Sequence, residues 1–212
     1  MDDWRARLDA YLTELLPPPP AALGPFTEAM RQRFGTDWSV GPLAGWTLHA
    51  LARLAGARRV LEIGTCLGAS AAWLALAVRD RGGSVLSIEV EHERVLAARE
   101  LLRQTGLDGV VTVIEGDAGA ILPTLEGPFE LIFQDGEKAA YLPLLEPCLQ
   151  LLAPGGLLVA DDGHFPLYPW SEADQSNAAA IREFSRALCQ RPELLPWFIP
   201  VGDGLLVAQR RA

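Results

Sequence analysis

Three aspartates follow two apolar segments of the chain, and their spacing could bring them together around a cation. Asp135 comes directly after residues 129–134, and Asp161 and Asp162 come directly after residues 156–160. If these segments are neighbouring parallel strands, about 4.8 Å apart, their carboxyl ends present all three carboxylates to one region. Like charges so close repel each other unless they are protonated or bridged by a cation. Oxygen ligands select a hard divalent ion, Mg²⁺ before Ca²⁺ or Mn²⁺. We therefore expect a metal site here, although each aspartate alone could simply cap a helix.

Lys138 is the candidate general base beside these carboxylates. It lies three residues after Asp135 and is the only lysine among 18 basic side chains. Arginine does not lose its proton in proteins, whereas a partly desolvated lysine near a metal can act as a base. The alternative is that one lysine survives here by chance.

A glycine-containing loop, residues 60–70, follows another apolar segment and predicts a ligand site. Ligands of open α/β sheets bind at the carboxyl ends of the strands, and Gly64 and Gly68 would allow a sharp turn. A dinucleotide site would show G-x-G-x-x-G, but its second glycine is replaced here by Cys66. Glu62 would repel a pyrophosphate and suits a cation such as a sulfonium amino acid.

Glu89, at the end of the next apolar segment, supports this interpretation. A carboxylate at that position can accept hydrogen bonds from two ribose hydroxyls. An ordinary glycine turn between a strand and a helix is the alternative.

The elements that would position these residues alternate between strands and helices. Two short runs, 195–200 and 205–209, have no room for a crossover helix between them and predict an antiparallel hairpin. The other predicted strands are 59–63, 84–90, 110–115, 129–134 and 156–160, and the helices between or after them are 69–80, 91–105, 118–125, about 141–153 and about 174–190. This pattern predicts an α/β fold with a doubly wound, mostly parallel seven-stranded sheet and a C-terminal antiparallel hairpin.

The first part of the chain predicts a helical extension. An amphipathic helix over 2–16 precedes the tetraproline 17–20, which is either a stiff spacer or a proline-rich recognition motif. Two more helices are expected over about 25–34 and 42–55. We predict a single domain, with residues 1–56 as the N-terminal extension and 57–212 as the core.

Composition excludes several partners. A net charge of −9 disfavours nucleic acid and anionic membrane surfaces as partners. No apolar run approaches the ~20 residues that span a bilayer, and the acidic N-terminus lacks a signal peptide. Three widely spaced cysteines are typical of reduced thiols, so we expect a soluble cytoplasmic protein.

From about Trp38 to its C-terminus the chain resembles the metal-dependent O-methyltransferase family of catechol O-methyltransferase and caffeoyl-CoA O-methyltransferase. The resemblance is carried by the order of its motifs: V-G-x-x-x-G at 40–45, V-L-E-I-G-T-x-x-G-x-S at 60–70, I-E at 88–89, G-D-A at 116–118, F-x-D-x-x-K-x-x-Y at 133–141, L-x-P-G-G at 152–156, A-D-D at 160–162 and D-G-L-L-V-A at 203–208. It implies a Rossmann-like class I methyltransferase fold with S-adenosylmethionine (SAM) as cofactor.

The resemblance also implies roles for individual residues. Glu62 and Ser70 would hold the methionine end of SAM, Glu89 the ribose, and the Asp117-Ala118 backbone the adenine. The remaining cofactor-lining positions would be Val40, Gly64, Thr65, Gly68 and Asp135. Asp135, Asp161 and Asp162 match the family's metal triad, and Lys138 matches its catalytic base. The chain departs from the family pattern at three places. Asp162 stands where asparagine is usual, Cys66 stands where glycine is common, and residues 135–138 are D-G-E-K where D-A-D-K or similar is usual.

The function implied by the resemblance is methyl transfer from SAM to a hydroxyl of a small, catechol-like aromatic molecule. The metal would chelate two vicinal oxygens of the acceptor and lower the pKa of its hydroxyl, and Lys138 would take the proton. The segment His164–Trp170 would form an aromatic lid or simply a packed loop, with His164 a polar lid residue or a fourth group beside the metal. Family members suggest a homodimer.

Competing functions are distinguished by sequence. N-methyltransferases resemble one another in an [N/D]-P-P-[Y/F] motif after the fourth strand, where this chain has D-G-E-K at 135–138. Cys66 and the terminal hairpin disfavour a NAD-dependent oxidoreductase. A non-catalytic SAM-binding module and a methyltransferase of a non-catechol natural product stay open, as do the acceptor's identity and the metal.

Overall fold

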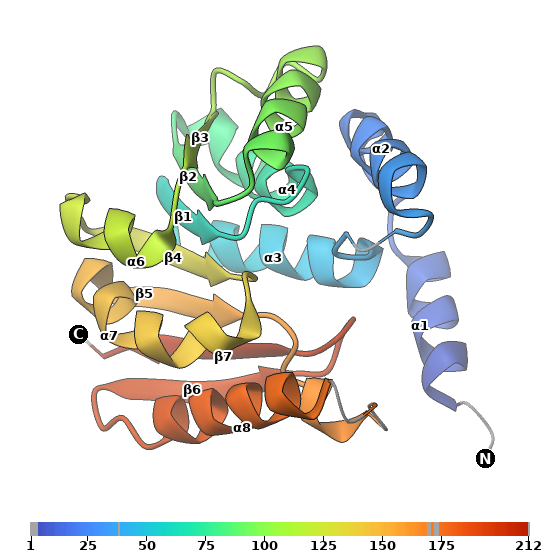
Figure 1. Cartoon of the computed structure of the whole chain (residues 1–212). Helices are drawn as coiled ribbons and strands as arrows, with labels where there is room; N and C mark the ends of the chain where they lie inside the picture. The colour runs from blue at the N-terminus through green and yellow to red at the C-terminus, as the bar shows by residue number, and fades with distance from the viewer. Residues whose placement is uncertain (1–3, 38, 169–170, 172–173, 212) are drawn as a thin grey trace.

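A seven-stranded mixed sheet forms the centre of the molecule, with strand order β3-β2-β1-β4-β5-β7-β6 (Figure 1). The computed structural model describes residues 4–37, 39–168, 171 and 174–211. The strands are β1 (Arg59–Ile63), β2 (Ser84–Glu89), β3 (Val111–Glu115), β4 (Phe129–Gln134), β5 (Leu152–Ala160), β6 (Leu194–Ile199) and β7 (Leu205–Arg210). Strands β1 to β5 are parallel, and β7 runs antiparallel to both β5 and β6. The predicted fold class and terminal hairpin are confirmed.

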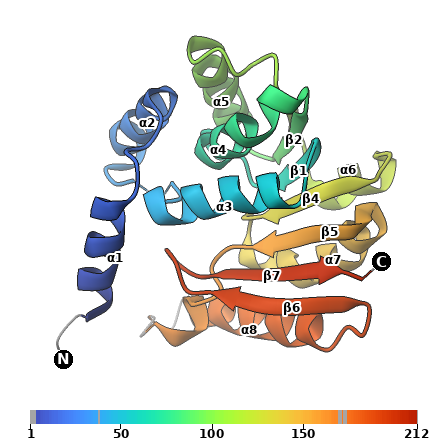
Figure 2. The same cartoon turned by 180° about the vertical axis from the view of Figure 1, so that it is seen from behind.

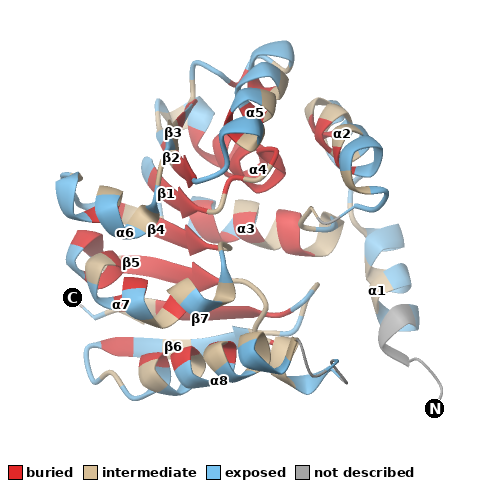
Figure 3. Ribbon diagram, viewed as in Figure 1, coloured by how far each residue is buried: buried red, intermediate tan, exposed pale blue. Residues whose placement is uncertain are grey.

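Helices cover both faces of the sheet, because successive strand residues point to opposite sides. Val60 packs into the core beneath α3 and α4, whereas Leu61 packs into the core beneath α7 and α8. The helices are α1 (Trp4–Leu15), α2 (Gly24–Phe34), α3 (Pro42–Leu54), α4 (Ala69–Val78), α5 (His92–Gln104), α6 (Ala118–Ile121), α7 (Tyr141–Leu151) and α8 (Gln175–Cys189). The alanine-rich α4 is buried along its whole length, where it packs on the sheet and against α3 (Figure 3).

Strands β4 and β5 are neighbours, as the site prediction requires. Gln134 is the register partner of Ala160, and the Asp161 N–H donates to the Gln134 carbonyl at 3.0 Å. The start of β5 was predicted wrongly at residue 156, since the strand begins at Leu152. Its Pro-Gly-Gly sequence does not end the strand but lies at an irregularity, where the register with β4 shifts between Phe129 and Leu131.

The N-terminal helices extend from one side of the sheet (Figure 2). The helix predicted over 2–16 is confirmed as α1, but its apolar face is not packed into the core: Tyr11 is 58% exposed and Leu15 62%. The tetraproline acts as an extended spacer, anchored where the Trp46 indole N–H donates to the Pro17 carbonyl at 3.0 Å. The exposed face of α1 is compatible with a homodimer, which stays a prediction. In the described part of the chain, none of the helices combines the length and hydrophobicity needed to cross a bilayer.

The packing of α3 on α4 gives the first testable prediction. A Cβ at Gly45 would lie 2.2 Å from the Trp73 indole, which is held among buried side chains. We therefore expect Gly45→Ala to lower the free energy of unfolding by about 1–3 kcal/mol, measured by urea denaturation. Gly24→Ala is the matched control, because a Cβ there has nothing within 4 Å and its backbone is helical. Equal stability of the two variants would contradict the prediction.

Candidate active site

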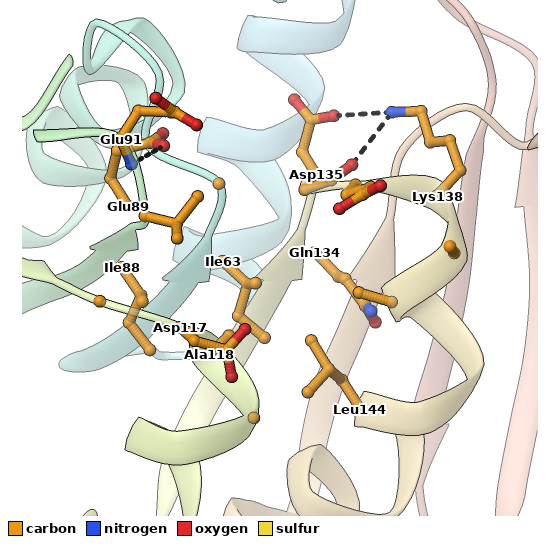
Figure 4. A pocket seen from close by; sticks show the side chains of 18 of the residues that line it. Ile63, Ile88, Glu89, Glu91, Asp117, Ala118, Gln134, Asp135, Lys138 and Leu144 are labelled. Carbon is orange, nitrogen blue, oxygen red and sulfur yellow. Dashed lines mark hydrogen bonds and ion pairs between the residues drawn. The ribbon is translucent and has the colours of Figure 1, made fainter. Parts of the chain in front are cut away.

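A cavity of about 830 Å³ opens at the carboxyl ends of β1, β2 and β4 (Figure 4). Its walls come from the loops after β1, β2 and β3 on one side and from residues 134–144 on the other. Several predicted site residues line it, namely Gly64, Glu89, Asp117, Ala118, Asp135 and Lys138. The sheet therefore brings these residues, from four separate loops, to one cavity.

The loop after β1 needs its unusual backbone. Gly64 has φ +97°, and a Cβ there would lie 2.2 Å from the Asp135 carbonyl oxygen, so glycine is required for the close approach of β1 and β4. Cys66 also lies in the left-handed region, with φ +47°. This conformation explains why glycine is common at that position in the family, and here the cysteine adopts it.

Glu89 holds the same loop from the end of β2. Its carboxylate accepts hydrogen bonds from the Cys66 N–H at 2.7 Å and the Glu91 N–H at 3.0 Å. Because Glu89 also lines the cavity, its carboxylate is fixed in place where a ligand hydroxyl could reach it.

Four other predicted cofactor residues, Val40, Thr65, Gly68 and Ser70, lie off the wall of this cavity. Thr65 and Ser70 are buried behind the loop, and the Thr65 hydroxyl lies 2.5 Å from that of Ser87. Val40 borders a separate cavity of about 230 Å³ beside Trp73. A Cβ at Gly68, at the start of α4, would lie 3.3 Å from the Phe26 ring.

Glu62, which likewise does not line the cavity, is a fully buried carboxylate with one unsatisfied oxygen. Its Oε2 accepts a short hydrogen bond from the Ser87 hydroxyl, but Oε1 has no hydrogen-bond partner among the described residues. Burial raises the pKa of Glu62 to about 7, although the hydroxyls of Ser70 and Ser87 oppose the change. A buried carboxylate of this kind would be stabilised by a cationic amine.

The predicted carboxylate cluster forms at the tips of β4 and β5. The Lys138 ammonium forms ion pairs with Asp162 and, at 3.7 Å, with Asp135. Asp161 faces its neighbour, since its Oδ1 accepts the Asp162 N–H at 2.8 Å. Burial and the charge of Asp161 raise the pKa of Asp135, and burial and the charge of Asp162 raise that of Asp161 to about 7.

Lys138 is the cation of this cluster in the structure. Burial disfavours its ammonium form, but the charges of Asp135 and Asp162 outweigh burial and raise the pKa of Lys138. In the described residues no group of three or more histidine, cysteine, aspartate or glutamate side chains is arranged to hold a metal ion. The metal stays a prediction. Its donor set is chemically suitable, because carboxylate oxygens are ligands of hard divalent ions and the pKa values of Asp135 and Asp161 are raised.

The segment predicted as a lid is packed against the terminal hairpin. The His164 ring stacks on Phe198 with centroids 5.3 Å apart. The N–H groups of Gly163 and His164 donate to the carbonyls of Gly204 and Asp203, and the Tyr168 hydroxyl donates to the Asp203 carboxylate at 3.1 Å. Residues 169–170 of the predicted lid lie outside the described residues.

Known proteins share this sequence pattern and architecture. The sequence profile of a family described as O-methyltransferase matches residues 21–211. The chain belongs to the O-methyltransferase family. The predicted family resemblance is confirmed, and the match extends it towards the N-terminus to include α2.

Individual relatives of this O-methyltransferase support its place in the family. A catechol O-methyltransferase of Niastella koreensis is 33% identical over 159 residues, which are 73% of this chain and 72% of that protein. The O-methyltransferase TomG of Streptomyces achromogenes, involved in tomaymycin synthesis and solved in complex with SAM, is 31% identical with a TM-score of 0.86, and each chain covers 100% of the other. The methyltransferase PaMTH1 of Podospora anserina, solved with S-adenosylhomocysteine (SAH), is 28% identical with a TM-score of 0.90, over 100% of this chain and 97% of its own.

Two residues of the O-methyltransferase site were missed by sequence reasoning. Gln134 lines the cavity, and Tyr141 lies beneath Lys138, whose Nζ is 5.5 Å from the ring centroid. Gln134 was assigned only to its strand, and Tyr141 only to its helix and to the motif at 133–141, without a role in the site. A polar residue at the carboxyl end of the strand, after the apolar residues 131–133, was the available signal for Gln134.

The buried Glu62 predicts a specific pH dependence of stability. The folded protein holds the Glu62 proton more tightly than the unfolded chain, so this group costs stability as pH rises from about 4.5 through 7. Glu62→Gln removes that titration. Relative to wild type, we expect its free energy of unfolding to rise by about 1–3 kcal/mol between pH 5 and 8, measured by urea denaturation without ligand.

Glu183→Gln, at an exposed glutamate of α8, makes the same change in net charge and should follow the wild-type curve. If the free energies of unfolding of Glu62→Gln and wild type differed by a constant amount across this pH range, the raised pKa of Glu62 would be refuted.

Proposed function

We propose that the protein transfers a methyl group from SAM to a hydroxyl of a small, catechol-like aromatic molecule, with a divalent metal ion and Lys138 as base. The observation that carries the proposal is the position of Asp135. This residue lines the large cavity and also lies 3.7 Å from Lys138, so a donor in the cavity and an acceptor at the carboxylate cluster would meet there.

The cavity residues suit the parts of SAM. Glu89 accepts hydrogen bonds from the ribose hydroxyls, and the Asp117-Ala118 backbone contacts the adenine. Glu62 interacts with the ammonium of the methionine part, which would supply the missing partner of its buried Oε1. Glu62 lies behind the cavity wall, so this contact requires the loop of residues 64–70 to move and open a path to its carboxylate. The SAM and SAH complexes of related O-methyltransferases support SAM as the methyl donor.

The metal would be held by Asp135, Asp161 and Asp162. When bound, it would act as a Lewis acid towards the acceptor oxygens and, by taking up the carboxylate charge, would favour the neutral amine of Lys138. The raised pKa values of Asp135 and Asp161 support a cation at this position, because both carboxylates are ionised more easily beside one.

Methyl transfer then needs alignment and one proton transfer. The Lys138 amine accepts the proton of the acceptor hydroxyl, and the oxygen attacks the methyl carbon in line with the carbon–sulfur bond. That bond breaks, its electron pair stays on sulfur, and SAH is released. The ring of Tyr141 beneath Lys138 and the ion pair with Asp162 hold the amine at the edge of the cavity.

A catechol-like acceptor fits because two vicinal oxygens would fix both its position and its acidity. The relative named catechol O-methyltransferase supports this class. Tomaymycin synthesis, in which TomG takes part, favours the alternative of another natural-product hydroxyl.

Metal dependence can be tested by chelation. We expect EDTA to reduce turnover on a catechol panel at least 100-fold and excess Mg²⁺ to restore it. Asp162→Ala should abolish the Mg²⁺-dependent activity, whereas Asp162→Asn should retain it, because an amide oxygen can still be a ligand. Full activity in EDTA would rule out the metal.

The base role of Lys138 can be separated from its charge. Lys138→Arg keeps a cation beside Asp162 but cannot give it up, and Lys138→Met removes it. We expect both variants to lower kcat by about 10²- to 10⁴-fold with little change in SAH affinity, measured by steady-state kinetics and calorimetry. Wild-type kcat in Lys138→Arg would show that only the charge matters.

A further inference from the structure

Gln134 is a buried polar side chain on the wall of the cofactor cavity that no proposed step uses. It ends β4, directly before Asp135, and is 1% exposed. Its neighbours in the wall include the apolar side chains of Ile63, Ile88 and Leu144, as Figure 4 shows. A polar group in such surroundings costs free energy unless it is hydrogen-bonded.

Only half of the Gln134 amide is satisfied within the described residues. Its Nε2 donates to the Tyr141 carbonyl at 3.2 Å, whereas its Oε1 has no hydrogen-bond partner there. The backbone carbonyl of Tyr141 can only accept, so this bond fixes the orientation of the amide. A flipped amide would put two acceptors together. The carbonyl oxygen of Gln134 is therefore left as an acceptor at the wall of the cavity, where a bound ligand could supply the donor.

The hydrogen-bond donors of the proposed cofactor are few, which limits the groups that could reach the Gln134 oxygen. Glu89 is the acceptor proposed for the ribose hydroxyls, and Glu62 for the methionine ammonium. The remaining N–H donor is the exocyclic amine of adenine. Asp117 also lines the cavity, but one of its carboxylate oxygens already accepts the Ala120 N–H at 3.0 Å as the cap of α6.

We propose that Gln134 binds the purine base of the methyl donor and selects adenine, by accepting a hydrogen bond from its 6-amino group. This inference rests on the proposed function, because it requires SAM in the cavity. A hydrogen bond to a buried acceptor discriminates strongly, since a base without the amine leaves the Gln134 oxygen unsatisfied. Gln134 is thus a specificity-determining residue for the cofactor.

The test compares two ligands and three proteins by isothermal titration calorimetry. The ligands are SAH and its analogue with an unsubstituted purine, which lacks the 6-amino group. We expect wild-type protein to bind SAH about tenfold more tightly than the analogue. Gln134→Met, nearly isosteric and apolar, should reduce that preference by about fivefold to tenfold, mainly by weakening SAH binding.

Gln209→Met is the matched control. The Gln209 amide makes the same kind of bond, to the Gly155 carbonyl at 3.1 Å, but lies on β7 away from the cavity lining. It should keep the wild-type preference. An unchanged preference in Gln134→Met, or equal weakening of both ligands, would overturn the proposal.

The two hypotheses fail in different ways. If wild-type protein binds neither SAH nor the analogue, the proposed cofactor is wrong. If wild-type protein binds SAH and Gln134→Met keeps its preference, only the role of Gln134 is wrong. Circular dichroism of both variants separates loss of folding from loss of binding, and Gln134→Leu gives a second apolar substitution if Gln134→Met does not fold.

Discussion

The repulsion between carboxylates at the ends of β4 and β5 is the interaction on which the rest of the site depends. Parallel pairing of these strands brings Asp135 and Asp161 together, and the left-handed backbone of Asp162, at φ +62°, adds a third carboxylate. Burial of such charges is costly unless a cation compensates them. Lys138 provides one positive charge for three carboxylates, and the pKa values of Asp135 and Asp161 are raised beside it.

The carboxylate cluster and the cofactor cavity are structurally coupled, because β4, which carries Asp135 at its end, pairs directly with β1, whose following loop lines the cavity. Gly64 and the Asp135 backbone are so close that a Cβ at Gly64 would lie 2.2 Å from the Asp135 oxygen. Any displacement of the loop after β1 therefore moves the residue that connects the cavity to Lys138. An in-line displacement requires the methyl donor and the acceptor to be closely aligned. The contact between Gly64 and Asp135 helps to align them, because it fixes two ligand-binding loops from separate strands relative to each other.

Sequence predicted the scaffold better than the chemistry of the site. Six of the seven strands lie within one residue of their predicted bounds, because β-branched apolar runs between helices leave few alternatives. Strand β5 differed, because the preceding helix was predicted to reach about residue 153, whereas the strand already begins at Leu152. Which side chains reach the cavity could not be predicted: Glu62 and Ser70 lie behind the loop, whereas Gln134 lines the wall. Those positions depend on the direction of the individual side chains in β1, α4 and β4, which the sequence pattern does not give.

The buried carboxylates of the site lower the stability of the unliganded protein when they are ionised. Glu62, Asp135 and Asp161 all have raised pKa values because burial disfavours their charged forms. A core chosen only for stability would hold apolar residues there. Their retention is explained if cations belong to the working protein, since a ligand that binds only the folded state returns the lost free energy through its binding. The same reasoning separates the two halves of the site, because an organic ammonium suits the enclosed Glu62 and a hard dication suits the aspartates at the strand tips. Binding of donor and metal should then reinforce the fold from two sides of the β1–β4 contact.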